Sequence, residues 1–471
     1  MLAIVAPLIV FGLVIFVHEL GHFVAAKLLG VYAPRFSIGF GPTLFKRRRG
    51  ETEYVLAALP LGGYVRMASR HDEAAAALEG GSEEASALAA DDPDYDPEAM
   101  LPFGPKPVPE HRWFESKPLW ARLIILLAGV AMNVLLTFVV ATGLAMHYGR
   151  AIYPTTVIGT VDSVAWAPAF AASLRQGDTI RTVDGAPVAT WNAVLERIGK
   201  ARADSLVMTT SRGRVALATR GNEDRLREVA AAIAFHQPAV IGGTIAGRAA
   251  EKAGLRAGDS VVAIDGVPVT GWAGMVDRVT ASAGRELAMT VRRGGQTLEL
   301  RVTPEASEEP DPASGKVVRL GRIGASAPDI ATREPVGLVD GLRSGWNGTW
   351  AWGGTIITFV RGLFAGDVSP RQLGGPIAIT RASVQAAQGG LADLVALIGL
   401  LSINVAILNL LPIPILDGGQ VLLNVAESVK GSPFSLRTRE YILRVGLAAI
   451  GLLFVLVMFN DIASLVGRLF G

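Results

Sequence analysis

The chain has 471 residues, half of them hydrophobic (50%), and a mean hydropathy of +0.39. This is too apolar for an ordinary soluble protein and predicts several membrane spans joined to soluble parts. The absence of cysteine excludes disulfides, thiolate zinc ligands and cysteine nucleophiles, and a net charge of only +2 predicts no nucleic-acid partner.

The first predicted element is an apolar helix at the N-terminus. Residues 1–17 carry no charge, and the apolar run continues to Ala26, long enough to cross a bilayer. Within it lies His-Glu-Leu-Gly-His, whose His18 and His22 share one helix face. This pattern predicts that both imidazoles bind one zinc ion, with Glu19 as general base. The alternative is a chance match at a helix end, with the polar groups reaching the interface.

A small β-region is predicted beside this helix, so that residues 1–70 form one domain. Gly41-Pro42 is expected to turn the chain, and Lys46 to Arg49 form a basic cluster that marks the cytoplasmic side. Short strands are expected at 35–40, 53–58 and 60–65.

An acidic segment and a second span follow. Residues 71–118 are predicted to be a disordered cytoplasmic loop, because 72–98 contain ten acidic residues and no basic one. Residues 119–150 are the predicted second transmembrane helix, since no Asp, Glu, Lys or Arg occurs between Leu123 and Tyr148. Asn133 in its middle either bonds a neighbouring helix or faces the active site, and the structural role is favoured.

An internal repeat defines the next region. Residues 172–191 align without gaps to 253–272, 81 residues further on, and ten of the twenty positions are identical. The repeat predicts two small domains of one fold, at 154–222 and 238–306. Their Gly-Asp and Asp-Gly-x-Pro-Val patterns resemble PDZ domains, which bind extended peptides at a sheet edge. The alternative is a pair of spacers without a ligand.

The C-terminal region predicts one interfacial helix and two further spans. Residues 337–364 contain tryptophan, glycine and threonine in proportions that favour the membrane surface over a crossing. A third transmembrane helix is expected at 391–419 and a fourth at 440–467. Four basic residues near their junction predict a cytoplasmic loop: Lys430, Arg437, Arg439 and Arg444.

The third span carries the best candidate for a third zinc ligand. Two prolines interrupt its helix, and Asp417 follows at membrane depth, where an unpaired charge is costly. A catalytic zinc ion needs three protein ligands. With four spans, Asp417 reaches the same membrane face as the histidines, whereas a fifth span at 344–360 would put it on the opposite face. The alternative is an ordinary Asp-Gly turn that ends a helix.

These motifs, taken in order, resemble the site-2 protease family of intramembrane zinc metalloproteases, in particular its bacterial regulator-of-sigma-E type. Supporting stretches are Phe36–Gly41, Pro60–Val65, Leu373–Ile377 and the PDZ-like pair. The resemblance implies a polytopic α-helical membrane protein with four transmembrane helices, a membrane-associated β-region and two PDZ-like α/β domains. It also implies a bacterial inner-membrane location, with the PDZ-like domains periplasmic and the active site near the cytoplasmic side.

The resemblance further implies the roles of individual residues. Glu19 would activate water, and Asn409 would orient the substrate or stabilise the oxyanion, with Asn404 as a second candidate. The implied zinc ligands are His18, His22 and Asp417. The implied substrates are single-span membrane proteins, such as an anti-sigma factor after a first cleavage, or remnant signal peptides. Further partners would be the lipid bilayer and peptide or protein ligands of the PDZ-like domains.

Two other classes of function remain open on the sequence. A non-catalytic PDZ-type membrane scaffold would bind peptides and would need neither Glu19 nor Asp417. An ion transporter that uses buried carboxylates should show inverted repeats among its spans. The only repeat found in this sequence lies in the soluble part.

Overall fold

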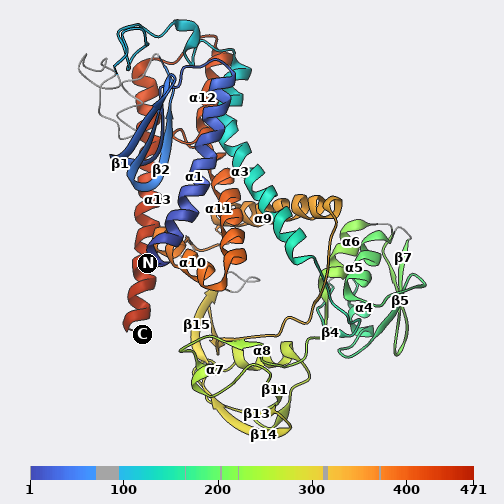
Figure 1. The fold of residues 1–471 in the computed structure, drawn as a ribbon. Coiled ribbons are helices and arrows are strands. Elements are labelled where there is room, and N and C mark those ends of the chain that lie inside the picture. The colour runs from blue at the N-terminus through green and yellow to red at the C-terminus, as the bar shows by residue number, and fades with distance from the viewer. Residues whose placement is uncertain are drawn as a thin grey trace. The chain divides into compact units, whose positions relative to one another are not determined.

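The computed structural model describes residues 2–69, 95–164, 166–201, 204–220, 222–310, 317–366, 368–370 and 373–470. These residues divide into two compact units (Figure 1). The first unit comprises Met1–His147 and Val336–Gly471, and it contains the apolar helices. The second comprises Tyr148–Pro335 and holds two hydrophobic cores of its own.

Among the described residues, four helices of the first unit are long and apolar enough to cross a membrane: α1 (Leu2–Leu28), α3 (Leu119–Tyr148), α11 (Leu391–Asn409) and α13 (Leu436–Phe470). Even the shortest, with 19 residues, is about 28 Å long, close to the ~30 Å hydrocarbon core of a bilayer. On α13, Phe454 and Phe459 are 56% and 68% exposed. Such surfaces are costly in water but suit lipid. The four predicted spans are therefore confirmed as four helices of the required length and composition.

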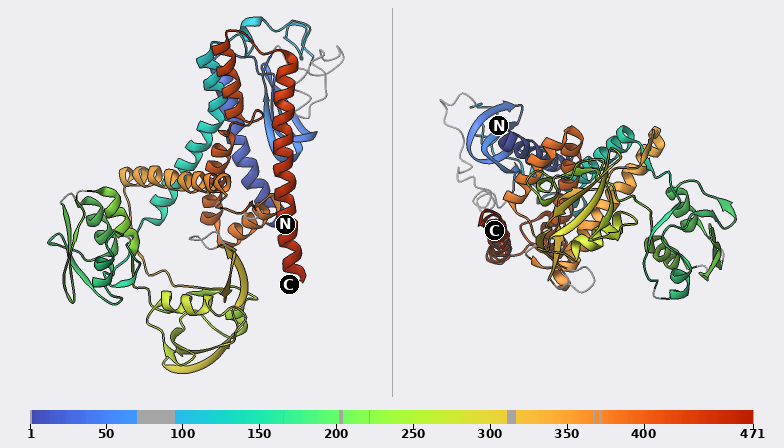
Figure 2. Two further views of the ribbon diagram at one scale, coloured as in Figure 1. Left: turned by 180° about the vertical axis from the view of Figure 1, so that it is seen from behind. Right: turned by 90° about the horizontal axis from the view of Figure 1, so that it is seen from below.

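The segment expected as an interfacial helix forms α9 (Leu338–Ala365), which is not among the spanning candidates found in the described residues. Both side views show α9 lying crosswise to α3 and α11 (Figures 1 and 2). A Cβ at Gly345 would lie 2.8 Å from the backbone nitrogen of Thr142, so glycine is needed for α9 to pack this closely on α3. Trp346 and Trp350 remain 56% exposed, in keeping with a position at the membrane surface.

The expected third span at 391–419 is interrupted. α11 ends at Asn409, turns follow, and α12 (Asp417–Lys430) begins at the predicted third ligand. Pro412 and Pro414 explain the break, because proline has no N–H to continue the helical hydrogen bonds. Asp417 therefore stands at the start of a short helix that the sequence analysis did not predict.

The β-region contains strand segments close to the three expected ones, and residues 43–49 add a fourth. β1 (Arg35–Arg49) pairs antiparallel with β2 (Thr52–Arg66), and the chain reverses at Gly50, whose φ is +64°. The prediction of a turn at Gly41-Pro42 is confirmed, because residues 35–38 run parallel to 53–56 whereas residues 43–49 run antiparallel to 52–57. Gly41 has a φ of +85°, and Pro42 cannot donate to the ladder, so the chain reverses here although β1 continues to Arg49.

Part of the segment expected to be disordered is ordered. Residues 70–94 lie outside the described residues, so the prediction of disorder for them stays untested. Residues 95–118 bury Phe103 and include the short 3-10 helix η1 (Glu110–Arg112). The backbone N–H of Tyr32 donates to the carbonyl of Arg112 at 2.9 Å, which attaches this segment to the end of α1.

A side-chain cluster reinforces that attachment. The Arg112 guanidinium bonds Glu51 at 2.8 Å and lies 5.2 Å from the centre of the Tyr32 ring. The bond from Arg112, together with one from Lys27, holds the pKa of Glu51 at about 2. Burial raises the pKa of Tyr32 to about 12.

A span also anchors α10 (Pro376–Gly389). Asp461 of α13 is only 3% exposed, and its carboxylate accepts hydrogen bonds from the backbone N–H groups of Gly375, Ile377 and Ala378 at 2.9–3.2 Å. These groups have no partner within the first turn of a helix. α10 packs against α1 and α11, so Asp461 links the last span to the first unit's core.

The second unit contains two copies of one arrangement. The first sheet has the order β6 (Ala186–Pro187), β5 (Ile180–Val183), β7 (Ser205–Thr210), β8 (Gly213–Ala218). The second has the matching order β12 (Val267–Pro268), β11 (Ser260–Ile264), β13 (Leu287–Arg293), β14 (Gln296–Val302). The corresponding helices are α5 (Trp191–Lys200) and α8 (Trp272–Thr280).

The copies also share an ion pair to a buried aspartate at the same 81-residue offset. Asp178 accepts from Arg212 at 2.6 Å, and Asp259 accepts from Arg293 at 2.6 Å. The arginines lie outside the aligned twenty residues, so the repeat extends further than the sequence identity.

Both repeat domains continue beyond their expected boundaries, because a late strand returns to pair with an early one. These pairs are β9 (Ile233–Phe235) with β4 (Ile158–Val161), and β17 (Ala325–Ser326) with β10 (Gly243–Thr244). The remaining elements are α4 (Pro168–Ser173), α6 (Glu223–Ala232), α7 (Ala249–Lys252), the hairpin β15 (Glu305–Pro310) and β16 (Val317–Arg322), and β3 (Arg150–Ile152) paired with β18 (Thr332–Glu334).

Candidate metal centre

Helix α1 presents two imidazoles to one point. His18 and His22 are each 7% exposed and lie one helical turn apart. Their Nε2 atoms are 3.2 Å apart. The apolar run keeps this stretch helical, because a helix satisfies its own backbone polar groups inside a membrane. The four-residue spacing thus brings both rings to the same side of α1.

Asp417 reaches the same point from α12. Its Oδ2 lies 3.2 Å from Nε2 of His18 and 3.5 Å from Nε2 of His22. The turn before α12 is tight, since a Cβ at Gly418 would lie 2.3 Å from the carbonyl oxygen of Leu410. Only glycine allows this close approach, and the turn carries the carboxylate back to the depth of the imidazoles.

These three donor atoms fit a tetrahedral zinc ion. Bonds of about 2.1 Å in tetrahedral geometry place neighbouring donor atoms about 3.4 Å apart. The observed separations are 3.2, 3.2 and 3.5 Å. Oδ2 of Asp417 is buried and has no hydrogen-bond partner, as expected of an atom that faces a cation. Within the described ranges, no other group of three His, Cys, Asp or Glu side chains converges in this way.

Helix α3 packs against both imidazoles. Nδ1 of His22 lies 2.8 Å from the carbonyl oxygen of Ile125, which can only accept, so Nδ1 carries the proton and the Nε2 lone pair faces Asp417. A Cβ at Gly129 would lie 2.3 Å from Nε2 of His22 and 2.8 Å from Cε1 of His18. No other side chain fits there without moving a ring.

Asn133 of α3 also reaches the centre, which the sequence analysis did not favour. Its Nδ2 lies 3.2 Å from Nδ1 of His18. Its backbone carbonyl accepts from the hydroxyls of Ser402 and Thr137 at 2.9 and 3.0 Å, so the interhelical role is present as well. A polar residue in the middle of an uncharged span was the signal for a functional position.

Glu19 and Asn409 border the ligands. A Cβ at Gly63 would lie 2.9 Å from Cγ of Glu19, so strand β2 runs directly beside this carboxylate. Asn409 ends α11, and its Nδ2 lies 3.1 Å from Nε2 of His18. Asn404 lies five residues earlier and therefore points about 140° away around the helix. Of the two asparagines, Asn409 is the one next to the cluster.

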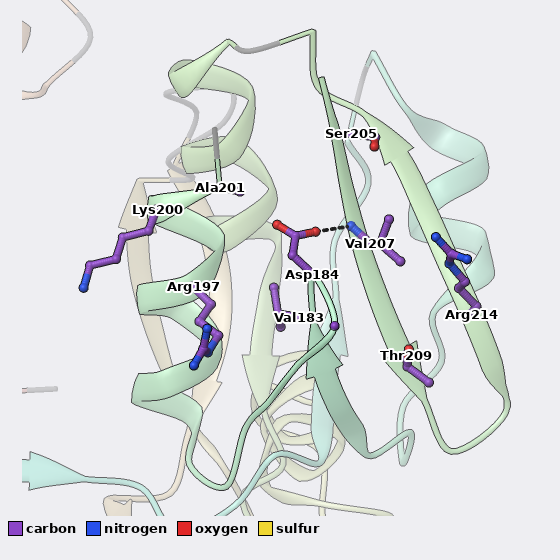
Figure 3. Close-up of a pocket in the computed structure, with 10 residues that line it drawn as sticks. Val183, Asp184, Arg197, Lys200, Ala201, Ser205, Val207, Thr209 and Arg214 are labelled. Carbon is purple, nitrogen blue, oxygen red and sulfur yellow. Dashed lines mark hydrogen bonds between the residues drawn. The ribbon is translucent and has the colours of Figure 1, made fainter. Parts of the chain in front are cut away.

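A separate hollow lies in the first repeat domain (Figure 3). It has a volume of about 770 Å³ and lies between α5 and strand β7. Its carboxylate, Asp184, already accepts a hydrogen bond from the backbone N–H of Val207 at 2.8 Å. Its basic side chains are Arg197, Lys200 and Arg214. This hollow has no metal-binding set of side chains and no paired nucleophile and base, so the candidate chemistry lies in the first unit.

The chain is similar over almost its whole length to proteins named as proteases. The family model of peptidase family M50 matches residues 6–453. A Neisseria meningitidis protein named as a zinc metalloprotease is 31% identical, covering 97% of this chain and 98% of the relative. The regulator of sigma-E proteases of Salmonella typhimurium and Escherichia coli are each 30% identical, over 98% and 97% of this chain and 98% of each relative.

Proposed function

Because the chain belongs to peptidase family M50 and is a zinc metalloprotease of the site-2 type, we propose that it cleaves transmembrane segments of single-span membrane proteins. The observation that carries the proposal is the convergence of His18, His22 and Asp417 at one buried point between apolar helices. A hydrolytic centre at this depth serves a substrate whose scissile bond lies inside the membrane.

The proposed zinc ligands are Nε2 of His18, Nε2 of His22 and Oδ2 of Asp417. Zinc, when bound, supplies a Lewis acid that polarises the scissile carbonyl and makes water nucleophilic near neutral pH. Glu19 follows the first ligand in the chain and is the proposed general base. It takes the proton of the attacking water and later passes it to the leaving amine.

Asn409 is the proposed oxyanion donor. Its Nδ2, 3.1 Å from His18 Nε2, borders the position that a scissile carbonyl would take. A preorganised N–H donor stabilises the negative charge that develops on that oxygen. The Asn409 side chain also holds the scissile carbonyl in one orientation relative to Glu19.

The β1–β2 hairpin is the proposed docking edge for the unwound substrate. A transmembrane helix bonds its own peptide groups, so a segment must unwind before water can reach its carbonyl. Residues 63–66 of β2 pair with 35–38 on one side, so their other edge is able to pair with an extended segment. Strand β2 passes next to Glu19 at Gly63, so a substrate paired with this hairpin would have its backbone close to the general base.

The proposed setting is the bacterial inner membrane. Basic residues occur in β1 after α1, as at Arg48, and in the first turn of α13, as at Arg437, and this supports a catalytic centre near the cytoplasmic side with the PDZ-like domains in the periplasm. Two relatives are named regulators of sigma-E. We therefore propose a membrane-bound anti-sigma factor, trimmed by a first protease, as the main substrate, and remnant signal peptides as a second class.

The decisive experiment compares the wild type with Glu19→Gln on a purified single-span substrate. Glutamine keeps the shape of the side chain and loses the base, so zinc content should equal that of the wild type. The cleavage rate should fall by about 10²- to 10⁴-fold. Near-normal turnover by Glu19→Gln contradicts the general-base role. No cleavage by the wild type, with peptide binding by the PDZ-like domains intact, supports the non-catalytic scaffold instead.

A further inference from the structure

Asn133 is held firmly at the centre of the first unit. Its side chain is completely buried, at 0% exposure. The hydroxyls of Thr137 and Ser402 donate to its backbone carbonyl, and Thr137 also donates to the carbonyl of Gly399 at 3.0 Å. The bond from Ser402 and the bond to Gly399 join α3 to α11, and the former uses the backbone of Asn133. They leave its carboxamide free for another partner.

Among the described residues, that carboxamide has one side chain within hydrogen-bond distance, His18. Its Nδ2 lies 3.2 Å from Nδ1 of His18, while its Oδ1 is buried and has no hydrogen-bond partner. Buried polar atoms are nearly always hydrogen-bonded, so this unpaired oxygen needs an explanation. A half-turn of the carboxamide exchanges Oδ1 and Nδ2 at nearly the same positions.

The tautomer of His18 decides which atom belongs next to it. Nε2 of His18 faces Asp417 and the Nε2 of His22, so a metal held there takes the Nε2 lone pair. The ring proton must then sit on Nδ1, which becomes a donor. Two N–H donors facing each other repel, whereas Oδ1 in that position accepts the proton's hydrogen bond and gains its missing partner.

We propose that Asn133 is a positioning residue of the metal centre, whose Oδ1 accepts a hydrogen bond from Nδ1–H of His18. The inference rests on the proposed zinc site and deepens it. The carbonyl of Ile125 does the same for His22 at 2.8 Å. Helix α3 thus supplies the outer hydrogen bond of both imidazole ligands, and such bonds fix ring orientation and raise ligand basicity.

Of the two hydrogen-bond acceptors, Ile125 and Asn133, only Asn133 can be tested by substitution. Ile125 uses its backbone, which no substitution removes, but Asn133 uses its side chain. Asn133→Leu removes the acceptor at similar volume. Asn133→Asp keeps an oxygen acceptor and removes the N–H₂ donor. Thr137→Val is the matched control, because it removes one hydrogen bond within α3, to Asn133, and one to Gly399 of α11 without changing the Asn133 side chain.

The experiment measures zinc per molecule, zinc affinity by chelator competition, and the visible spectrum of the cobalt-substituted protein. It uses full-length wild type and the three variants in detergent. We expect Asn133→Leu to bind zinc about 10- to 100-fold more weakly and to shift the cobalt bands. Asn133→Asp should stay close to the wild type, and Thr137→Val should lower thermal stability while zinc affinity is unchanged.

Two results overturn the inference. Wild-type zinc affinity in Asn133→Leu would mean that His18 needs no acceptor. An affinity loss in Asn133→Asp equal to that in Asn133→Leu, with both proteins folded, would mean that Asn133 acts as a donor. Absence of zinc binding in the wild type is a different outcome, because it refutes the zinc site itself.

Discussion

A methyl group added at Gly129 should disable the metal centre. The alanine Cβ would lie 2.3 Å from Nε2 of His22 and 2.8 Å from both Cδ2 of His22 and Cε1 of His18. Ordinary contacts at a Cβ begin near 3.4 Å. The shortest contact must therefore lengthen by about 1 Å, through movement of the rings or separation of α1 from α3.

Movement of the rings and separation of α1 from α3 would each disturb the metal centre. The ring of His22 is hydrogen-bonded to the carbonyl of Ile125, which lies on α3 as Gly129 does. The ring therefore cannot swing away from α3 without losing that bond. Separation of the helices would open the close packing at Gly21, where α1 lies so near α3 that a Cβ would be 2.3 Å from the carbonyl oxygen of Ala128. Metal–ligand distances are held within about 0.2 Å. A shift of about 1 Å should therefore cost at least about 10²-fold in cleavage rate.

The assay compares Gly129→Ala with Gly143→Ala, a control on the same helix. A Cβ at Gly143 meets nothing within 4 Å, and alanine favours a helix over glycine by up to about 1 kcal/mol. The control should keep wild-type zinc content, cleavage and thermal stability, whereas Gly129→Ala should lose zinc and cleavage. Wild-type zinc affinity in Gly129→Ala would refute the argument, because it would show that α3 does not hold the imidazoles in place.

Three further predictions follow from other contacts. Asn409→Ala should keep its zinc and lose about 10²- to 10³-fold in kcat, measured on the single-span substrate; an unchanged kcat removes the oxyanion role. Ile152 and Thr332 are paired across β3 and β18, so residues 153–331 can be replaced by a two-residue Asn-Gly turn. This deletion should preserve zinc binding and raise cleavage of full-length relative to trimmed substrate, whereas an unchanged ratio would mean that the repeat domains only support folding. The folded pKa of Glu51, about 2, lies below its usual value of 4.5, so its stabilisation is complete above about pH 4.5 and is lost as the pH falls toward 2. Glu51→Gln should lower the melting temperature at neutral pH and flatten its decline over that acid range, and an unchanged melting curve would contradict this.

Much of the fold could be predicted because the membrane restricts what a sequence can do. A helix in lipid must be long and apolar, so four spans could be located from hydropathy, and four such helices are present. The repeat could be found from identical residues at one offset. The β-region was less predictable, because residues 35–38 pair with both 53–56 and 63–66, and such a register depends on contacts that no local pattern encodes.

The sequence by itself determined that His18 and His22 lie on one helix face with Glu19 between them, because a helix converts four-residue spacing into proximity. It also supplied Asp417 as a candidate, through the cost of a carboxylate at membrane depth. Only the tertiary structure decided that Gly129 and Asn133 of α3 lie against the two imidazoles. Gly129 and Asn133 lie more than a hundred residues from the histidines in the chain, and their roles depend on distances between helices. Local sequence specifies which residues share a helix face, whereas packing between helices specifies which faces meet.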